Sequence, residues 1–427
     1  MDTPINSRRE FLKNMAIGGS AAFLAATPWL KVFAGDTVSK GAGDRVRIAF
    51  IGTGSRGQEL LRNMILVMKE DNIDICALCD NYQPHLNTAF EFCNKNGFSP
   101  KTYNDYRKLI EREKLDGVVI ATPLFEHAHI TIDCLNSGLN VFCEKAMART
   151  VEDVKRMYDT HIKTNKILQI GHQRTFNPIY LEGMQRIHNG DIGKIGQIRA
   201  YWHRNNDWRR PLPNNDKSFD KQINWRLYKE CSAGLLTELM SHQLQVATWA
   251  LDQFPVSVMA SGSIVYWKDG RTVPDNIAVI YNFPNEAKFL YDSMISNKKY
   301  GLEEQVLGDK GTVEFEMNRY YTETPPPAPG IGQLVNNIEH GIFDNIGVAG
   351  TSWVPETADQ YKGERISPKD LYEDTKFELQ AYAAFIRKGK APDKMVKEAY
   401  YGSVWTLLAE KSIDTGQMVT LPEEFKI

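Results

Sequence analysis

The sequence predicts a two-domain α/β protein, in which a doubly wound parallel sheet is followed by an α+β domain with an open, largely antiparallel sheet. Three observations predict this fold class. A chain of 427 residues is longer than one hydrophobic core usually serves. In the first half, short apolar runs alternate with helical patterns, and in the second half several strand-like runs follow one another.

The apolar runs of the first half are continuous rather than alternating, which indicates parallel strands that are buried on both faces. These runs occupy 46–51, 73–79, 116–121, 140–143 and 167–170. Helical patterns between or beside them occupy 55–69, 83–94, 105–113, 126–137 and 151–164. We therefore expect one doubly wound domain over residues 45–170.

The rhythm changes near residue 180. The segment 195–204 alternates like a strand with one exposed face, and further strand-like runs follow at 256–265, 277–283, 287–292, 305–307 and 312–315. Helical patterns lie at 235–251, 377–388 and 396–415, and the last two are expected to close this domain. The proline-rich stretch 322–330 is predicted to be a surface loop. Residues 171–427 thus read as a substrate-binding and oligomerisation domain with an open sheet.

Composition excludes several classes of protein. The net charge is −2 and the charges are mixed along the chain, which argues against a nucleic-acid-binding protein. Beyond the N-terminus, no apolar run reaches the ~18 residues of a membrane span. Cys76 and Cys79 lie three apart in one strand-like run and face opposite ways, which suits neither a disulfide nor a metal site. We expect buried free thiols and no metal.

The N-terminus has the features of an export signal. Arg8 and Arg9 precede Phe-Leu-Lys and a mildly apolar stretch rich in Gly and Ala, and Val-Phe-Ala at 32–34 offers a cleavage site. This pattern resembles a twin-arginine signal. It predicts a signal peptide over 1–34, a linker over 35–44, export by the twin-arginine translocase and a periplasmic location without stable membrane insertion. The alternative is an amphipathic helix that happens to carry two arginines.

A glycine-rich turn follows the first predicted strand and opens the first helix. Gly52 permits the tight turn, Gly54 lets a pyrophosphate approach the backbone, and Gly57 lets the helix pack closely on the strand. Ser55 and Arg56 complete the turn, where the helix N-terminus offers free N–H groups to phosphates. The motif in this context predicts a dinucleotide site, the alternative being a core turn without a ligand.

An acidic residue indicates which dinucleotide binds. Asp80 ends the second predicted strand, about 23 residues beyond the glycine turn. A carboxylate at this point bonds both hydroxyls of the adenine ribose and repels a 2′-phosphate. The sequence therefore predicts NAD rather than NADP.

These motifs, together with Ala-Thr-Pro at 121–123, His127 and Glu-Lys at 144–145, resemble the glucose–fructose oxidoreductase/inositol dehydrogenase (Gfo/Idh/MocA) family. The resemblance continues through 171–178 and 234–242, and so covers most of the mature chain. The family pattern is Glu-Lys-Pro, whereas this chain has Ala146. Typical members also carry Asp four residues before a His, where this chain has Glu238 before His242.

The resemblance implies a Rossmann domain and oxidation of a secondary alcohol, with NAD as hydride acceptor. It implies that Lys145 and His242 handle the hydroxyl proton and that Glu238 supports them. Burial near a positive ring depresses the pKa of a lysine, and a neutral histidine accepts protons, so both types suit this role. The structural alternatives are a Lys145–Glu144 salt bridge and a core histidine at position 242.

The resemblance also suggests which further residues contact ligands. The candidates for NAD are Thr122, Pro123, His127, Glu144 and Lys145, although His127 suits a helix cap equally well. An aromatic and cationic cluster is typical of sugar sites. Its candidates are Arg174, His203, Trp208, Trp225 and Arg226, with Trp202 and Arg209 nearby. The alternative is packing between subunits, because the family associates through its open sheet and a homo-oligomer is expected.

Export has a consequence for the chemistry, because free NAD is scarce outside the cytoplasm. We expect an exported oxidoreductase that folds around NAD, keeps it, and moves hydride to and from a sugar or glycoside hydroxyl. One alternative is an NAD-dependent glycoside hydrolase that works by transient oxidation and elimination. Another is a catalytically silent sugar-binding protein. The motifs at Lys145 and His242 favour the dehydrogenase.

Overall fold

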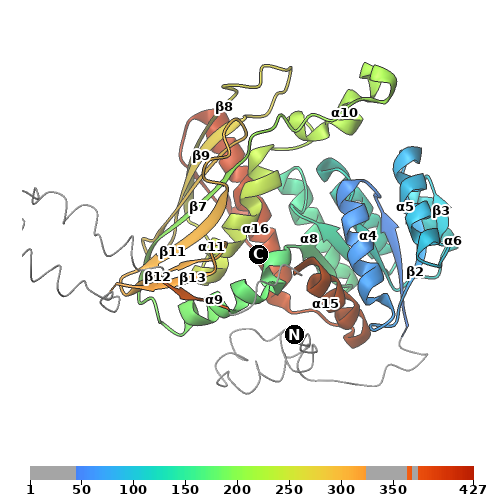
Figure 1. The fold of residues 1–427 in the computed structure, drawn as a ribbon, viewed down its shortest axis with the longest axis horizontal. Coiled ribbons are helices and arrows are strands. Elements are labelled where there is room, and N and C mark those ends of the chain that lie inside the picture. The colour runs from blue at the N-terminus through green and yellow to red at the C-terminus, as the bar shows by residue number, and fades with distance from the viewer. Residues whose placement is uncertain (1–44, 324–362, 368–373) are drawn as a thin grey trace, which may run out of the picture.

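The computed structural model describes residues 45–323, 363–367 and 374–427, and contains two sheets with their covering helices (Figure 1). The predicted fold class is confirmed, because a parallel Rossmann sheet precedes a mixed, mostly antiparallel one. The predicted signal peptide, the linker and most of the proline-rich loop lie outside the described residues. No helix of the described residues is long and apolar enough to cross a membrane.

The first sheet has six parallel strands in the order β3-β2-β1-β4-β5-β6. Its strands are β1 (Val46–Ile51), β2 (Ile73–Cys79), β3 (Lys101–Tyr103), β4 (Gly117–Ile120), β5 (Asn140–Glu144) and β6 (Leu168–Gly171). Its crossover helices are α4 (Ser55–Met68), α5 (Gln83–Lys95), α6 (Tyr106–Arg112), α7 (His127–Asn136) and α8 (Val151–Thr164). Strand β3 was not predicted from the sequence, because this edge strand is short and largely exposed.

Helix α15 (Asp374–Lys388) covers the first sheet, although the sequence suggested that it closes the second domain. It packs beside α4 (Figure 1). The Tyr382 hydroxyl lies 2.8 Å from the carbonyl oxygen of Asn140 and 3.0 Å from that of Val118. A late segment of the chain therefore completes the core of the N-terminal domain.

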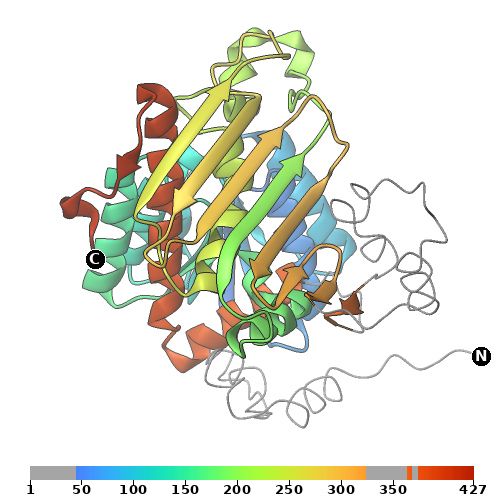
Figure 2. The same ribbon diagram turned by 90° about the vertical axis from the view of Figure 1, so that its left-hand side faces the viewer.

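The second sheet has nine strands in the order β14-β13-β12-β11-β7-β10-β9-β8-β15, and only β7 and β10 pair in parallel. Its strands are β7 (Ile195–His203), β8 (Ser257–Ser263), β9 (Asn276–Asn282), β10 (Lys288–Met294), β11 (Leu302–Gly308), β12 (Gly311–Glu314), β13 (Arg319–Thr322), β14 (Glu364–Arg365) and β15 (Val419–Thr420). The helices packed with it are α9 (Pro178–His188), which the sequence analysis missed, α11 (Ser241–Leu251) and α16 (Asp393–Thr415). In the described chain, Figure 2 shows no helix over the other face.

Strand β7 divides its side chains between the two faces of this sheet. Ile198 and Ala200 are buried against the helices, and Trp202 follows on the same side. His203 points to the open face, where its Nε2 lies 2.5 Å from Asp292 Oδ2. Two adjacent residues of the predicted sugar cluster therefore lie on opposite faces.

The cysteine prediction is confirmed. All six cysteines are free thiols, and five of them are buried, the exception being Cys76, which is partly exposed. Burial raises the pKa of the Cys79 thiol to about 12, which makes it a poor nucleophile. Cys79, Cys93, Cys134 and Cys143 are therefore packing residues of the main core.

Candidate active site

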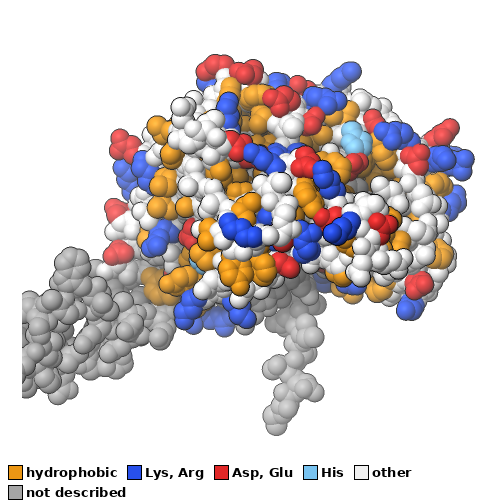
Figure 3. All heavy atoms as spheres, turned by 90° about the horizontal axis from the view of Figure 1, so that it is seen from above, with side chains coloured by type: hydrophobic (Ala, Val, Ile, Leu, Met, Phe, Trp, Pro, Cys, Tyr) orange, Lys and Arg blue, Asp and Glu red, His pale blue; other side chains and the backbone are white. Residues whose placement is uncertain are grey.

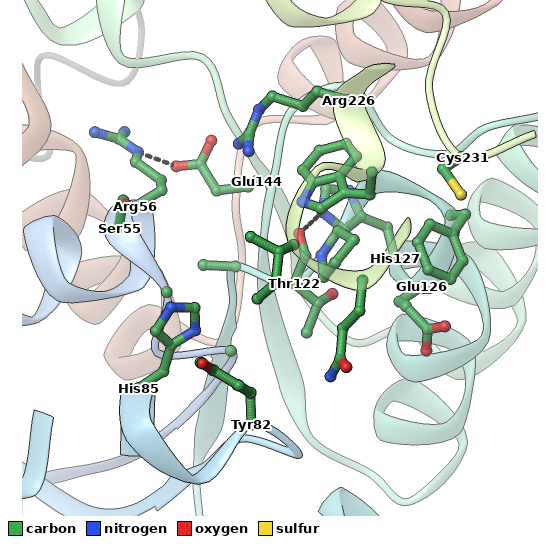
Figure 4. A pocket seen from close by; sticks show the side chains of 18 of the residues that line it. Ser55, Arg56, Tyr82, His85, Thr122, Glu126, His127, Glu144, Arg226 and Cys231 are labelled. Atoms are coloured by element: carbon green, nitrogen blue, oxygen red, sulfur yellow. Dashed lines mark hydrogen bonds and ion pairs between the residues drawn. The ribbon is translucent and has the colours of Figure 1, made fainter. Parts of the chain in front are cut away.

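A cavity of about 1140 Å³ lies where the carboxyl ends of the parallel strands meet the second domain (Figure 4). Ligands of doubly wound sheets bind at this edge. The predicted residues that line the cavity are Gly52, Gly54, Ser55, Arg56, Asp80, Thr122, Pro123, His127, Glu144, Lys145, Trp208, Trp225, Arg226, Glu238 and His242. Three predicted residues are not part of the lining, namely Gly57, Arg174 and His203.

The glycine turn has the shape that a pyrophosphate requires. Gly52 has a φ of +89°, and a Cβ there would lie 2.6 Å from the backbone of Ala121. A Cβ on Gly57 would lie 2.1 Å from the carbonyl oxygen of Gly52, so the helix packs against the turn itself. A Cβ on Gly54 would meet no atom closer than the ring of His85 at 3.6 Å, so there is room above this residue. Among the described residues, no side chain caps the N-terminus of α4, so its N–H groups can bind phosphate oxygens.

Asp80 stands at the edge of this turn, fixed by three hydrogen bonds. Its Oδ2 accepts bonds from the backbone N–H and the hydroxyl of Thr53, at 2.7 and 3.1 Å, and its Oδ1 accepts one from the Tyr82 N–H at 2.8 Å. A carboxylate has about four acceptor positions, so one remains for a ribose hydroxyl, where the sequence predicted bonds to both hydroxyls. The residues of this edge fit NAD.

Arg56 does not point a free charge at the cofactor site. Its guanidinium lies 2.7 Å from Glu144 and 2.8 Å from Glu59, and so ties α4 to the end of β5 (Figure 4). Burial opposes a charge here, but the two carboxylates outweigh it and raise the pKa of Arg56 above its ordinary value. Arg56 is therefore a neutralised cation beside the glycine turn.

His127 joins two loops at the wall of the cavity. Its Nδ1 lies 2.9 Å from the carbonyl oxygen of Ala146, and its Nε2 lies 3.0 Å from that of Thr122. The residue at the N-cap of α7 is Glu126, so His127 is not the cap. The Lys145–Ala146 peptide, where the family pattern has Pro, is cis. His127 lines the cavity and also holds its wall together.

Lys145 reaches across to the second domain. Its Nζ donates hydrogen bonds to the carbonyl oxygens of Glu238 and Thr237, at 2.9 and 3.3 Å. These carbonyls belong to a π-helical turn, Leu236–Met240, a rare geometry that often marks functional sites. The structure does not show the salt bridge to Glu144, which binds Arg56 instead. Burial lowers the pKa of Lys145, although Glu238 and Glu144 oppose this.

Glu238 forms the charged support of the same corner. Its Oε2 accepts a bond from Arg226 Nε at 2.8 Å, and its Oε1 accepts one from Ser232 Oγ at 3.1 Å. Burial alone would raise the pKa of Glu238, but Arg226 and Lys145 outweigh burial and hold it below the ordinary value. Glu238 is therefore an ionised carboxylate beside a buried amine.

His242 is the second residue of α11, the helix that follows the π-helical turn. It is 6% exposed, and its ring centroid lies 5.8 Å from Trp202. Burial, followed by the charges of Lys145 and Arg174, lowers the pKa of His242 well below its ordinary value. The ring is therefore neutral at pH 7, and its buried Nδ1 has no hydrogen-bond partner in the described structure. Because the His242 residue lines the cavity, its neutral imidazole can exchange a hydrogen bond with a substrate hydroxyl.

The aromatic and cationic cluster reaches the cavity only in part. Arg226 stacks on Trp225 at 4.1 Å, and Trp208 lines the cavity nearby. Arg174 is buried behind this wall, where it binds Glu304 at 3.2 Å. The predicted sugar contact of His203 has no support in this geometry, because that side chain lies on the open face of the sheet.

The sequence predicted Trp208, Trp225 and Arg226 of the second domain at the site, but not that the segment which carries them crosses to the N-terminal domain. The segment 204–231 passes over the N-terminal domain and carries α10 (Asp220–Ile223) (Figure 1). From above, acidic and basic side chains intermingle on this face of the molecule (Figure 3). Arg204, Arg210 and Gln222 of this segment line the cavity. The only signal in the sequence was an irregular stretch rich in Arg and Trp.

Comparison with protein families gives two matches in tandem. "Oxidoreductase family, NAD-binding Rossmann fold" matches residues 46–172, and "GFO/IDH/MocA C-terminal domain" matches residues 180–314. Myo-inositol 2-dehydrogenase of Thermotoga maritima is 26% identical over 382 residues, which are 88% of this chain and 99% of the relative. A glycosyl hydrolase family 109 protein of Stenotrophomonas maltophilia is 29% identical over 205 residues, 46% of this chain and 42% of the relative. The chain spans about half the length of the family 109 relatives it matches.

Solved structures show the same fold. Myo-inositol 2-dehydrogenase from Lactobacillus plantarum matches with a TM-score of 0.65 and 21% identity, over 88% of this chain and 100% of that one. Aldose-aldose oxidoreductase from Caulobacter crescentus matches with a TM-score of 0.66 and 20% identity, over 88% of this chain and 100% of that protein. Levoglucosan dehydrogenase in complex with NADH and levoglucosan matches with a TM-score of 0.66 and 19% identity, over 89% and 100%.

Proposed function

The chain belongs to the Gfo/Idh/MocA oxidoreductase family, and on that premise we propose that it oxidises and reduces a secondary hydroxyl of a sugar or glycoside. One observation carries the proposal. Lys145 and His242, from different domains, line the same cavity as the NAD-binding turn, and burial lowers the pKa of both. The structures with this fold include sugar oxidoreductases, which agrees with a carbohydrate substrate.

NAD, when bound, supplies a hydride acceptor, and the residues of this chain handle the proton. A neutral Lys145 has two N–H bonds and one lone pair. The carbonyl oxygens of Thr237 and Glu238 accept the two N–H bonds, so the lone pair is left for the proton of the substrate hydroxyl. The π-helical turn thus orients the base, and the ionised Glu238 stabilises the ammonium that forms.

His242 completes the contact with the substrate. Its ring is neutral, so it can accept or donate one hydrogen bond to the reacting hydroxyl without placing a second positive charge beside Lys145. Arg226 is held by Glu238 and stacked on Trp225, so it presents a fixed donor and a flat surface to a sugar ring. Together these groups orient a polyhydroxyl ligand.

We expect the purified protein to carry NAD whose redox state changes when a substrate sugar is added. A panel of free sugars and glycosides is added to the protein, and the absorbance of bound NADH is recorded together with product masses. A protein that carries NAD and changes neither the absorbance nor the mass of any sugar contradicts the oxidoreductase proposal. That result favours a silent sugar-binding protein.

A second candidate function is an NAD-dependent glycoside hydrolase, which oxidises and re-reduces one substrate around an elimination step. The similarity to glycosyl hydrolase family 109 proteins, at 29% identity over half of their length, favours it. The two candidates differ in their products. A hydrolase releases the group attached to the sugar and leaves the bound NAD oxidised at the end of each turnover, whereas a dehydrogenase leaves the glycosidic bond intact.

We also propose that the protein is exported already folded around its NAD and keeps it. Arg8 and Arg9, outside the described residues, support this proposal. Replacing both with Lys is expected to leave the uncleaved protein in the cytoplasm, which cell fractionation and the mass of the mature chain measure. Normal periplasmic accumulation of this double variant would rule out the twin-arginine route.

Self-association through the second sheet is part of the same proposal. In the described chain no helix covers one face of this sheet, and Met259 and Ile280 are exposed there. The same face also exposes charged side chains such as Lys288 and Asp292, and a mixed sheet face without covering helices can be covered by another subunit. We propose a homo-oligomer joined at this face.

A further inference from the structure

Arg210 brings a positive charge from the second domain to the glycine turn. Its Nη1 donates a hydrogen bond to the hydroxyl of Ser55 at 2.8 Å. Ser55 is the first residue of α4, directly after Gly54, and both line the cavity with Arg210. The guanidinium therefore lies beside the uncapped N–H groups where the pyrophosphate of a dinucleotide binds in this type of turn.

The backbone of Arg210 is held in place from both sides. Asn224, which is 2% exposed, accepts the Arg210 N–H on its Oδ1 at 2.7 Å and donates its Nδ2 to the Arg210 carbonyl at 3.2 Å. The next residue is anchored too, since Arg209 binds Asp220 at 2.8 Å and Asp269 at 3.2 Å. The position of Arg210 is thus organised before any ligand arrives.

Arg210 has no carboxylate partner among the described residues. Burial and the nearby charge of Arg226 both lower the pKa of Arg210, which marks a cation without compensation. Arg56, next to Ser55, is the opposite case, since two carboxylates neutralise it. Of these two arginines at the turn, Arg210 is the one whose charge is available to an anion.

The same segment reaches the far end of the dinucleotide site. Gln222 Nε2 lies 3.4 Å from Asn81 Oδ1, and the ring of Phe219 lies 6.5 Å from that of Tyr82. Asn81 and Tyr82 directly follow Asp80, the predicted ribose ligand. The second domain therefore spans the site from the glycine turn to the ribose end.

We propose that Arg210 binds the pyrophosphate of NAD, so that the segment 204–231 of the second domain holds the cofactor against the glycine turn of the first. The guanidinium can bond two phosphate oxygens at once, while the helix N–H groups bond others. Release of NAD then requires this segment to leave the N-terminal domain. The proposal concerns cofactor retention and does not depend on which sugar is used.

The test measures how fast NAD leaves the purified protein. Wild-type protein and the variants R210A, R210K and K217A are desalted rapidly, and the nucleotide that remains is quantified over time. R210A is expected to release NAD roughly 10- to 100-fold faster, the usual worth of a hydrogen bond to a charged group. R210K keeps the positive charge but loses the planar guanidinium that can bond two oxygens at once. Its rate of NAD release should therefore lie between those of the wild type and R210A. Lys217 is exposed, belongs to the same segment and does not line the cavity, so K217A should match the wild type.

Competing ligands then identify the part of NAD that Arg210 binds. R210A should weaken the binding of ADP-ribose, which has the pyrophosphate, by the same factor as the binding of NAD. It should leave the binding of adenosine, which has no phosphate, unchanged. Equal weakening of adenosine would overturn the proposal, because Arg210 would then act only by keeping the segment in place. Unchanged NAD release with weaker NADP binding would also overturn it, since Arg210 would then contact a 2′-phosphate.

Discussion

Replacing His242 with Ala is expected to lower turnover by about 10²–10⁴-fold, the usual contribution of a positioned acid or base, in a folded protein that still carries NAD. The residue belongs to α11 of the second domain, whereas the glycine turn belongs to the first, so NAD binding should persist. Turnover is measured with a substrate sugar, and bound NAD is quantified after denaturation.

Two further variants make this result interpretable. His242→Asn keeps a side chain that can form hydrogen bonds but cannot take up a proton, and should lose nearly as much turnover as Ala. His161→Ala removes a histidine from α8, away from the cavity, and should leave turnover unchanged. Near-normal turnover of His242→Ala, with normal NAD content, would make His242 a structural residue.

Lys145→Met should cause a loss of similar size, about 10²–10⁴-fold, and should also change the pH profile. Burial lowers the pKa of Lys145 below the ordinary 10.5. Because only the neutral amine accepts a proton, oxidation by the wild type should rise with pH through this lowered pKa and then level. The variant should lack that rise. The rate of sugar oxidation against pH measures both effects.

The control for this variant is Lys155→Met on α8, which removes a lysine that is paired with Asp159 on the surface. It should retain both the rate and the pH profile. A Lys145→Met protein that keeps the rise with pH would show that another group titrates. A variant that has merely lost NAD is recognised by its nucleotide content.

The sequence predicted the parts of the site that depend on local spacing. Backbone atoms lie close to Gly52 and Gly57, whereas the space beside Gly54 is open. Glycines at this spacing between a strand and a helix predict both features. The resemblance to a family added Lys145 and His242, which are distant in the chain but share one cavity in the structure. Such a pairing across domains is not visible in any short window of sequence.

The parts that the sequence did not predict depend on long-range packing. The face on which His203 lies follows from the register of β7 with β10, because alternate residues of a strand face opposite ways. The partners of Arg56 and Arg210 could not be distinguished, since both are arginines near a polar stretch. Only the fold gives Arg56 two carboxylates and leaves Arg210, within the part of the chain that the structure describes, with none.

The π-helical turn was also not predicted from the sequence. Residues 235–251 read as one regular helix, and no residue type marks a change in hydrogen-bond register. In the structure, Leu236–Met240 is a π-helix and Ser241 begins the α-helix. The carbonyl oxygens that orient Lys145 belong to this turn, so the chemistry of the site depends on backbone geometry as well as on side chains.

Helix α15 has a consequence for the order in which the protein can be made. The N-terminal sheet is not fully covered until Tyr382 lies over Asn140 and Val118, and these residues are far apart in the chain. A growing chain on the ribosome thus carries an incomplete nucleotide-binding core until its final helices emerge, and a pairing of such long sequence separation forms late. A chain that ends before α15 would therefore leave exposed the part of the sheet that Tyr382 covers.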